Sequence, residues 1–222
     1  MKARIVSGSR ADYGLLVPVA EALHEPIHKY WGYGYAQAFT ETWYCLERDK
    51  PDVMLVLGDR YEILAAATAA HLKRIPIAHI AGGDVTLGSY DDAMRDCISR
   101  LATWHFVTSI QSQGRLMARS YSNVHLVGSP GVDVILRGEW RKERPIAEPY
   151  VVVSYQAETI DGTVDLDAVR EAIGNRHAVW ITPNPDRGSE RIPEGETFSH
   201  HEFLNLLHHC EEFIGNSSAM LY

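Results

Sequence analysis

Four aspartates are placed where they could act together in proton transfer. Asp59 ends one apolar run and Asp84 ends the next, while Asp91 and Asp92 open the helix-like segment that follows. Carboxylates that lie close together repel, so one holds a proton near neutral pH and acts as an acid while another acts as a base. The competing interpretation of Asp91 and Asp92 is that they only stabilise the positive end of a helix dipole.

A second group of residues could bind an anion. The motif GNSS ends a strand-like run, and its Gly215 permits a tight turn. Ser217 and Ser218 then offer hydroxyl and backbone N–H groups at a predicted helix start, which is a natural anion site. Arg10 or Arg60 would add local positive charge. A plain serine N-cap explains Ser217 and Ser218 about as well.

Alternating strand-like and helix-like segments must position these groups. Residues 51–59 and 75–84 are continuous apolar runs that end in glycine or aspartate, and an Ala-rich helical segment joins them. Such strands are typical of a parallel sheet covered on both faces, where ligands bind at the carboxyl ends of the strands. Polar or glycine residues follow nearly every predicted strand: Ser9, Arg10, Asp12, Asp59, Arg60, Gly82, Gly83, Asp84, Ser129, Gln156, Glu158, Asn184, Asp186, Asn216, Ser217 and Ser218. Each fits a turn or a cap when taken alone, but together they favour a ligand cleft between two domains.

The fold class that this alternation predicts is α/β, with two Rossmann-like, doubly wound parallel-sheet domains. The charged, Pro-containing segment GEWRKERPIAEP at residues 138–149 is a break in composition. We therefore expect an N-terminal domain over residues 1–137 and a C-terminal domain over residues 138–222. The second domain offers three strand candidates, YVVVSY, HAVWITPNPD and EEFIGNSS, which are too few for an independent sheet of usual size. The sequence thus predicts an incomplete second domain.

The stretch between Leu23 and Tyr44 has no strand-like run, although a βαβ unit needs about thirty residues or more. We therefore expect the sequence to join segments that are not covalent neighbours, with junctions near residues 24–35 and 173–176. The alternative is a naturally shortened chain.

Composition excludes several classes of protein. The 222 residues carry a net charge of -8, whereas a nucleic-acid binder usually has a basic excess. No window approaches eighteen consecutive apolar residues, which predicts no membrane span, and the N-terminal segment does not resemble a secretory signal. Cys45, Cys97 and Cys210 form no metal or disulfide pattern, so we expect a reducing cytoplasm.

Two histidine pairs are candidate metal ligands. His200–His201 and His208–His209 flank a predicted helix, and His201 and His208 are about two helical turns apart. That separation is too large for one metal ion to join them. A surface or domain-interface role is the better interpretation, and we expect no metal and no cofactor.

Taken together, the motifs resemble a known family. RADYG, PDVMLVLGDRYE, IPIAHIAGGDVTLGSYDDAMR, LVGSPGVD, PNPD and GNSS occur in that order, most closely between Pro51 and Asp133. The ordered set is similar to the hydrolysing UDP-N-acetylglucosamine (UDP-GlcNAc) 2-epimerases of sialic-acid-type sugar synthesis. RADYG in place of a GTRPE-like loop points to the hydrolysing branch.

The resemblance implies a GT-B arrangement of two Rossmann-like domains and a UDP-sugar substrate. It also implies a reaction in which a base removes the proton at C2 and UDP leaves by anti elimination. The acetamidoglucal intermediate is then hydrated to N-acetylmannosamine, without metal or nicotinamide. A homo-oligomer, dimer or tetramer, is the expected assembly.

The resemblance also assigns roles to residues. Asp59 matches the essential aspartate of the GD motif, and Asp91 matches the essential acid of DDxxR, with Arg95 beside it. Arg10 matches the loop arginine near the diphosphate. The full set of expected site residues comprises catalytic Asp59, Asp91 and Asp84, and substrate-binding Arg10, Arg95, Gln156, Asn184, Ser217 and Ser218.

Three departures from the family pattern keep other functions open. Ala81 stands where relatives often have a glutamate, and Asp84 keeps a carboxylate nearby. Gln156 stands where the family's HPxT loop has histidine, and glutamine cannot transfer protons near neutral pH. Arg95-Asp96 replaces Arg-His. The alternatives are a 2-epimerase of a UDP-diacetamido sugar, a GT-B glycosyltransferase, and a non-catalytic UDP-sugar-binding relative.

Overall fold

The computed structural model describes residues 1–86, 89–158, 162–185 and 187–217. The chain divides into two compact units, Met1–Asp133 and Val134–Tyr222. The boundary expected from composition, between residues 137 and 138, lies slightly later, at the end of helix α6 (Pro130–Arg137). None of the helices in the described part of the chain is both long and apolar enough to cross a membrane.

Unit 1 is built on a six-stranded parallel sheet with the strand order β2-β1-β3-β4-β5-β6. Its strands are β1 (Ala3–Ser7), β2 (Ile27–Lys29), β3 (Val53–Leu57), β4 (Ile77–Ile80), β5 (Trp104–Val107) and β6 (Val124–Leu126). Its connecting helices are α1 (Arg10–Leu23), α2 (Tyr35–Asp49), α3 (Tyr61–Leu72), α4 (Asp91–Leu101) and α5 (Ile110–Ala118).

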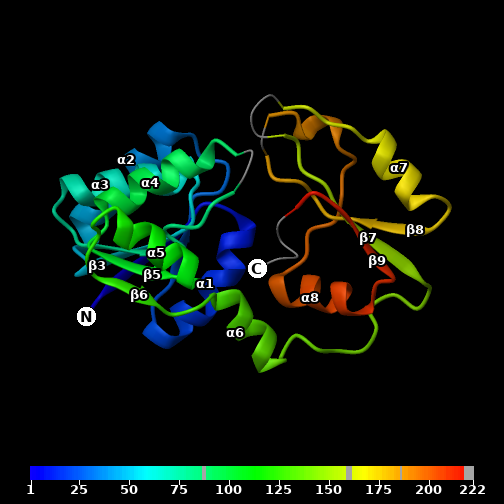
Figure 1. Ribbon diagram of the computed structural model, residues 1–222, viewed down its shortest axis with the longest axis horizontal. Coiled ribbons are helices and arrows are strands. Elements are labelled where there is room, and N and C mark those ends of the chain that lie inside the picture. Colours follow the sequence, from blue (N-terminus) through cyan, green and yellow to red (C-terminus); the bar gives the residue numbers. More distant parts are fainter. Residues whose placement is uncertain (87–88, 159–161, 186, 218–222) are drawn as a thin grey trace. The chain divides into compact units, whose positions relative to one another are not determined.

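Helices cover both faces of this sheet, as the continuous apolar runs predict. Helices α2, α3 and α4 lie side by side over one face (Figure 1), where Met54 and Val56 of β3 are fully buried. Helix α1 packs Leu16 against the opposite face, on Ile5 and Leu55. Alanines keep the buried helix α3 slim and strongly helical, which lets α2 and α4 pack closely against it. The doubly wound α/β architecture is therefore confirmed.

The expectation that residues 23–44 lack a strand is wrong. Ile27–Lys29 forms β2, which pairs in parallel with β1 through Ile5 and Ile27, and α2 follows it. This short edge strand has half-buried and exposed residues instead of a continuous apolar run, so periodicity could not show it. At the other expected junction, helix α7 (Asp167–Ile173) ends at Gly174, and the Arg176 N–H donates to the Ile173 carbonyl. Both expected junctions thus lie within ordinary strand, helix and turn structure.

Unit 2 contains the three strands that the sequence predicts. They are β7 (Tyr150–Ser154), β8 (His177–Trp180) and β9 (Glu212–Gly215), in the parallel order β8-β7-β9. Helix α7 packs on one face of this sheet and α8 (His200–His209) on the other (Figure 1). A short 3₁₀ turn, η1 (Ser189–Arg191), lies in the long connection from β8 to α8.

The histidine pair at the end of α8, His208 and His209, faces the irregular segment after α6. The His208 ring lies 5.4 Å from the Trp140 ring, centroid to centroid, in an edge-to-face arrangement. His209 Nε2 lies 3.2 Å from the Lys142 carbonyl oxygen, at hydrogen-bond distance. These contacts give His208 and His209 a packing role within unit 2.

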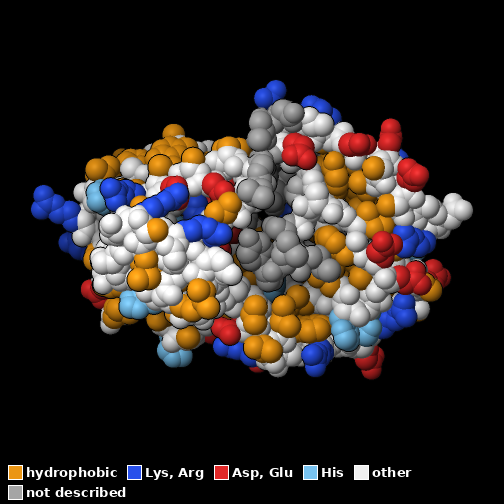
Figure 2. Space-filling model, in the orientation of Figure 1, with side chains coloured by type: hydrophobic (Ala, Val, Ile, Leu, Met, Phe, Trp, Pro, Cys, Tyr) orange, Lys and Arg blue, Asp and Glu red, His pale blue; other side chains and the backbone are white. Residues whose placement is uncertain are grey.

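Charged side chains are mixed at the surface. On the face that Figure 2 shows, the described Lys and Arg side chains are scattered among acidic and hydrophobic ones, without a continuous basic stretch. This distribution agrees with the acidic net charge of the chain.

Candidate active site

Two turns at the carboxyl edge of the unit 1 sheet carry the predicted residues. The first turn follows β3 and runs through Gly58 to Asp59, with Gly58 at a φ of +82°. The second follows β4 and runs from Ala81 to Asp84, with Gly83 at a φ of +79°. A β-carbon on Gly83 would stand 2.6 Å from the Ser112 carbonyl oxygen, so this close approach requires glycine.

Arg95 of α4 joins the two turns. Its guanidinium donates to carboxylate oxygens of Asp59 and Asp92, to the Asp84 carbonyl at 2.7 Å and to the Thr86 hydroxyl at 3.2 Å. The Arg95 side chain is only 6% exposed, so these charge-assisted hydrogen bonds form largely out of water. The structure thus brings together Asp59 and Arg95, which lie 36 positions apart in the sequence.

Asp59 has a perturbed proton affinity. Burial raises the pKa of Asp59 above its ordinary value, Arg95 opposes this, and the negative charges of Asp91 and Asp92 add to it. Of the four carboxylates predicted to repel one another, Asp59, Asp91 and Asp92 therefore lie close enough to interact. A carboxyl group with a raised pKa is suited to donating a proton nearer to neutral pH.

Asp91 and Asp92 open α4 but face different partners. Asp92 accepts hydrogen bonds from the Thr86 backbone N–H, at 3.0 and 3.1 Å, besides its contact with Arg95. Asp91 accepts a 2.7 Å hydrogen bond from the Ser89 hydroxyl. Asp92 is thus held in the ion-pair network, whereas the Asp91 carboxylate lies beside it, bound to a neutral hydroxyl group.

The Asp84 carboxylate points toward the next helix. It accepts hydrogen bonds from the Thr108 hydroxyl, at 2.8 and 3.1 Å, and from the Ser112 hydroxyl at the start of α5. Arg115 of the same helix donates to the Gly83 carbonyl at 2.8 Å. These contacts fix the turn after β4 on α5, and they occupy the carboxylate expected to take part in chemistry.

Sequence reasoning missed His79, the one polar residue within the apolar β4 run. Its Nε2 lies 2.8 Å from the Gly58 carbonyl oxygen and its Nδ1 lies 3.0 Å from the Ser99 hydroxyl. Burial lowers the pKa of His79 to about 3, so the ring is neutral at physiological pH. A neutral ring that donates to Gly58 and accepts from Ser99 satisfies both contacts. His79 therefore braces the turn that carries Asp59.

Arg10 is half-buried and is the first residue of α1, directly after β1. The N-cap of this helix is Ser9, whose side chain accepts from the Asp12 backbone N–H at 3.2 Å. Arg10 thus lies on the same carboxyl edge of the unit 1 sheet as Asp59, because β1 and β3 are parallel neighbours.

The carboxyl edge of the unit 2 sheet carries an amide network. Gln156, after β7, accepts the Asn184 backbone N–H on its side-chain oxygen at 2.9 Å. The Asn216 side chain, after β9, accepts the Gln156 N–H at 2.8 Å and donates to the Gln156 carbonyl at 2.9 Å. These bonds connect the loops that follow all three strands of unit 2.

The GNSS motif begins where β9 ends. Gly215 has a φ of +149°, and a β-carbon there would stand 2.0 Å from the Ser154 carbonyl oxygen of β7, so only glycine fits. Ser217 is half-buried and follows Asn216. Ser218, with the predicted helix start, lies outside the described residues, as does Asp186.

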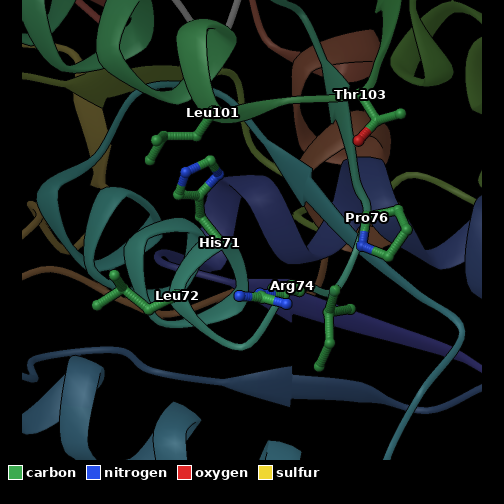
Figure 3. A pocket seen from close by; sticks show the side chains of 7 residues that line it. His71, Leu72, Arg74, Pro76, Leu101 and Thr103 are labelled. Atoms are coloured by element: carbon green, nitrogen blue, oxygen red, sulfur yellow. The ribbon is translucent and has the colours of Figure 1, made fainter.

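A pocket of about 470 Å³ lies in unit 1 near the N-terminal ends of β4 and β5, opposite to the carboxyl ends of the strands (Figure 3). It is lined by His71, Leu72, Arg74, Ile75, Pro76, Leu101 and Thr103. These residues come from the C-terminal ends of α3 and α4 and from the segments that enter β4 and β5. The pocket is therefore separate from the turns that carry Asp59 and Asp84.

A model of the family described as UDP-N-acetylglucosamine 2-epimerase matches residues 30–221. The chain belongs to this family. The match includes helix α4, which carries Arg95, and the turns after β3 and β4, which carry Asp59 and Asp84. The family resemblance that the ordered sequence motifs show is therefore confirmed.

Curated relatives of the family align with most of the chain. One is a hydrolyzing UDP-N,N'-diacetylbacillosamine 2-epimerase of Legionella pneumophila, 29% identical over 91% of this chain and 60% of its own length. Another is a UDP-N-acetylglucosamine 2-epimerase of Neisseria meningitidis, 28% identical over 77% of this chain and 52% of its own length. The chain thus spans roughly half to 60% of these relatives.

Solved structures of epimerases share the fold. The S. aureus MnaA–UDP co-structure has a TM-score of 0.79 at 16% identity, covering 99% of this chain and 76% of that one. The Neisseria meningitidis UDP-GlcNAc 2-epimerase bound to UDP-GlcNAc has a TM-score of 0.73 at 16% identity, covering 99% and 79%. At this identity the likeness establishes the α/β fold of the epimerase family.

Proposed function

We propose that the protein is a hydrolysing 2-epimerase that converts UDP-GlcNAc, or a related UDP-diacetamido sugar, together with one water molecule, into UDP and the free 2-epimeric sugar. The observation that carries this proposal is the Asp59–Arg95 pair with Asp91 and Asp92 beside it. The proposed reaction removes one proton at C2 and later returns one, so it needs carboxyl groups that differ in proton affinity. The RADYG loop and the name of the Legionella relative favour the hydrolysing reaction.

The roles follow from the environments of the two carboxyl groups. We assign the role of proton donor to Asp59, because burial and neighbouring negative charges raise its pKa. We assign removal of the C2 proton to Asp91, which is bound only by Ser89 in the described contacts and carries no ion pair there. Arg95 orients Asp59, and Asp84 positions the turn after β4 through α5.

The nucleotide is assigned to uncharged and cationic groups. Arg10, Asn184, Ser217 and Ser218 are proposed to contact UDP, as the family resemblance implies. The side-chain oxygen of Gln156 accepts a hydrogen bond from the Asn184 backbone N–H, so we propose that Gln156 shapes the UDP-binding loops. A carboxamide does not titrate near neutral pH, so Gln156 transfers no proton. Elimination and hydration transfer no hydride, so the proposal includes no nicotinamide, and the family resemblance implies that no metal is required.

A non-catalytic UDP-sugar-binding protein is the second candidate, because Ala81 and Gln156 replace two side chains that the family uses. NMR analysis of the products formed when the protein is incubated with UDP-GlcNAc or with a UDP-diacetamido sugar distinguishes the two candidate functions. Free UDP with N-acetylmannosamine, or with the corresponding diacetamido sugar, supports the proposed reaction. Saturable binding without turnover supports the second candidate. Turnover that requires an added acceptor would identify a glycosyltransferase and reject both.

We also propose that the protein acts in the cytoplasm. Cys45, Cys97 and Cys210 are free thiols, which fits the expected reducing cytoplasm. A homo-oligomer, dimer or tetramer, also remains a prediction, and light scattering of the purified protein would test it.

A further inference from the structure

Asp12 is an acidic residue of unit 1 that the proposed mechanism does not use. It lies in the first turn of α1, and its backbone N–H is bound by the N-cap hydroxyl of Ser9. Its Oδ1 lies 4.0 Å from the position that a β-carbon on Gly58 would occupy. The Asp12 carboxyl therefore packs beside the turn that leads directly into Asp59.

One oxygen of this carboxyl group has no hydrogen-bond partner in the part of the chain that the structure describes. Oδ2 of Asp12 is buried and makes no hydrogen bond to any described residue. A buried carboxylate oxygen without a partner is strongly unfavourable as an anion, whereas a protonated carboxyl avoids the cost of burying the charge. The geometry thus favours the neutral acid at this position.

Two acidic side chains that face Asp12 reinforce this preference, and one cationic side chain opposes it. Asp59 and Arg60 approach from the turn after β3, and Glu62 approaches from the start of α3. Arg60 is itself bound by fully buried Glu62, with N–O distances of 3.1 and 3.2 Å. Burial raises the pKa of Asp12 to about 7, against the opposing effects of Ser9 and Arg60 and with a further rise from Asp59 and Glu62.

We propose that Asp12 is a positioning residue of the Asp59 site, which works with its carboxyl group protonated. Neutral Asp12 fills the space beside Gly58 without adding a charge, so Asp59 keeps its contact with Arg95. When Asp12 releases its proton to solvent, the new negative charge repels the ionised form of Asp59, which pairs with Arg95, and attracts Arg60. This role rests on the proposed function of Asp59, but the protonation of Asp12 does not.

The first experiment measures thermal stability, which does not depend on activity. Asp12 binds its proton more tightly in the folded protein than in the unfolded chain, where its pKa is 3.8. Its contribution to stability is therefore complete at low pH and is lost as pH rises from about 4 to about 7. Asp12→Asn keeps the shape and removes the titration, so its Tm relative to wild type should rise by about 5 °C or more between pH 5 and pH 8. Asp12→Ser also removes the titrating carboxyl group, so it should show the same rise in Tm relative to wild type between pH 5 and pH 8.

A matched control is Asp96→Asn, because Asp96 is exposed on α4 and pairs with Arg119. Its Tm difference from wild type should be the same at pH 5 and pH 8. If the Asp12 variants also show a constant difference, Asp12 is charged at neutral pH and the proposal is wrong.

The second experiment follows UDP release as a function of pH. Wild type should lose kcat/KM as pH rises through about 7, and Asp12→Asn should keep most of its pH 6 activity while this decline flattens. If Asp12→Asn instead lowers activity by the same factor at every pH, the role of Asp12 is merely structural and the proposal is wrong. If no UDP is released by wild type, the proposed function fails, and the stability measurement still decides the protonation of Asp12.

Discussion

The two units place different chemistry at the same position of the fold. At the carboxyl edge of the unit 1 sheet, Arg95 binds Asp59 and Asp92, so this edge is ionic. At the carboxyl edge of the unit 2 sheet, Asn216 binds the Gln156 backbone and the Gln156 side chain binds the Asn184 backbone, so the network is uncharged. Parallel topology fixes where the loops meet, and residue type decides what the loops can do.

This difference predicts unequal sensitivity to substitution. Carboxyl groups with altered proton affinity can exchange protons with a substrate, whereas carboxamides can only bind and orient. We therefore expect substitutions at the ionic edge to affect the chemical step and substitutions at the amide edge to affect binding.

The largest expected effect is on catalysis at the ionic edge. Asp59→Asn and Asp91→Asn each preserve shape but remove an acid–base group, so kcat should fall by roughly a hundredfold to ten-thousandfold. Initial rates of UDP release provide the measurement. Asp96→Asn, on the exposed part of α4, is the matched control and should change the rate little. Full activity in both the Asp59 and Asp91 variants would reject their assignment.

The next effect concerns acid stability. Burial lowers the pKa of His79 to about 3 from 6.5, so the unfolded chain binds the proton first, and stability is lost as pH falls from 6.5 toward 3. At pH 4 the loss from this residue is on the order of 3 kcal/mol. His79→Gln, which does not titrate, should show a weaker dependence of unfolding free energy on pH. His71→Gln, at the exposed end of α3, should keep the wild-type slope, and equal slopes in all three proteins would contradict the inference.

A further effect concerns the ion-pair network. Arg95→Met leaves the carboxylates of Asp59 and Asp92 without their cation, which should destabilise the protein by about 3 kcal/mol. The corresponding decrease in Tm is about 6–12 °C for a chain of this size. Arg119→Met removes an exposed partner of Asp96 and should shift Tm by less than about 2 °C. Equal shifts in the two variants would show that burial does not strengthen the Arg95 network.

The smallest effect is expected at the amide edge. Gln156→Ala removes one neutral hydrogen bond to the Asn184 backbone, a loss of about 1 kcal/mol. We expect KM for the UDP-sugar to rise about fivefold while kcat stays within about twofold, because no proton passes through this residue. Steady-state kinetics over a range of substrate concentrations separate the two constants. A selective fall in kcat would show that Gln156 acts in the chemical step.

Much of the fold could be predicted from the sequence. The runs that form β3, β4 and β7 are buried on both faces, which makes them continuously apolar and easy to recognise. Strand β2 was missed because it has only three residues, none of them buried, at the edge of the sheet. Helix α6 was missed because it begins within the loop-like motif VGSPG and has only eight residues.

The candidate site could be predicted only in outline. The order of strands and helices brings Asp59, Asp84 and Arg95 to one edge, and the sequence motifs name them. The choice of partners depends on the turns, where Ala81 and Gly83 have positive φ values and direct the Asp84 carboxylate toward α5. The burial of Asp12 depends likewise on side chains from α1, α3 and the turn after β3. No local pattern encodes such contacts between distant segments.

Exchange of the C2 hydrogen tests the division between the two edges most directly. Wild type, Asp59→Asn, Asp91→Asn and Gln156→Ala would be incubated with saturating UDP-GlcNAc in D₂O, with the UDP-diacetamido sugar as the second substrate, and deuterium at C2 would be followed by NMR. We predict deuterium at C2 of the product for wild type and Gln156→Ala, and a loss of exchange of roughly a hundredfold or more for the two aspartate variants. Undiminished exchange in both aspartate variants, with exchange abolished in Gln156→Ala, would contradict the assignment of proton transfer to unit 1.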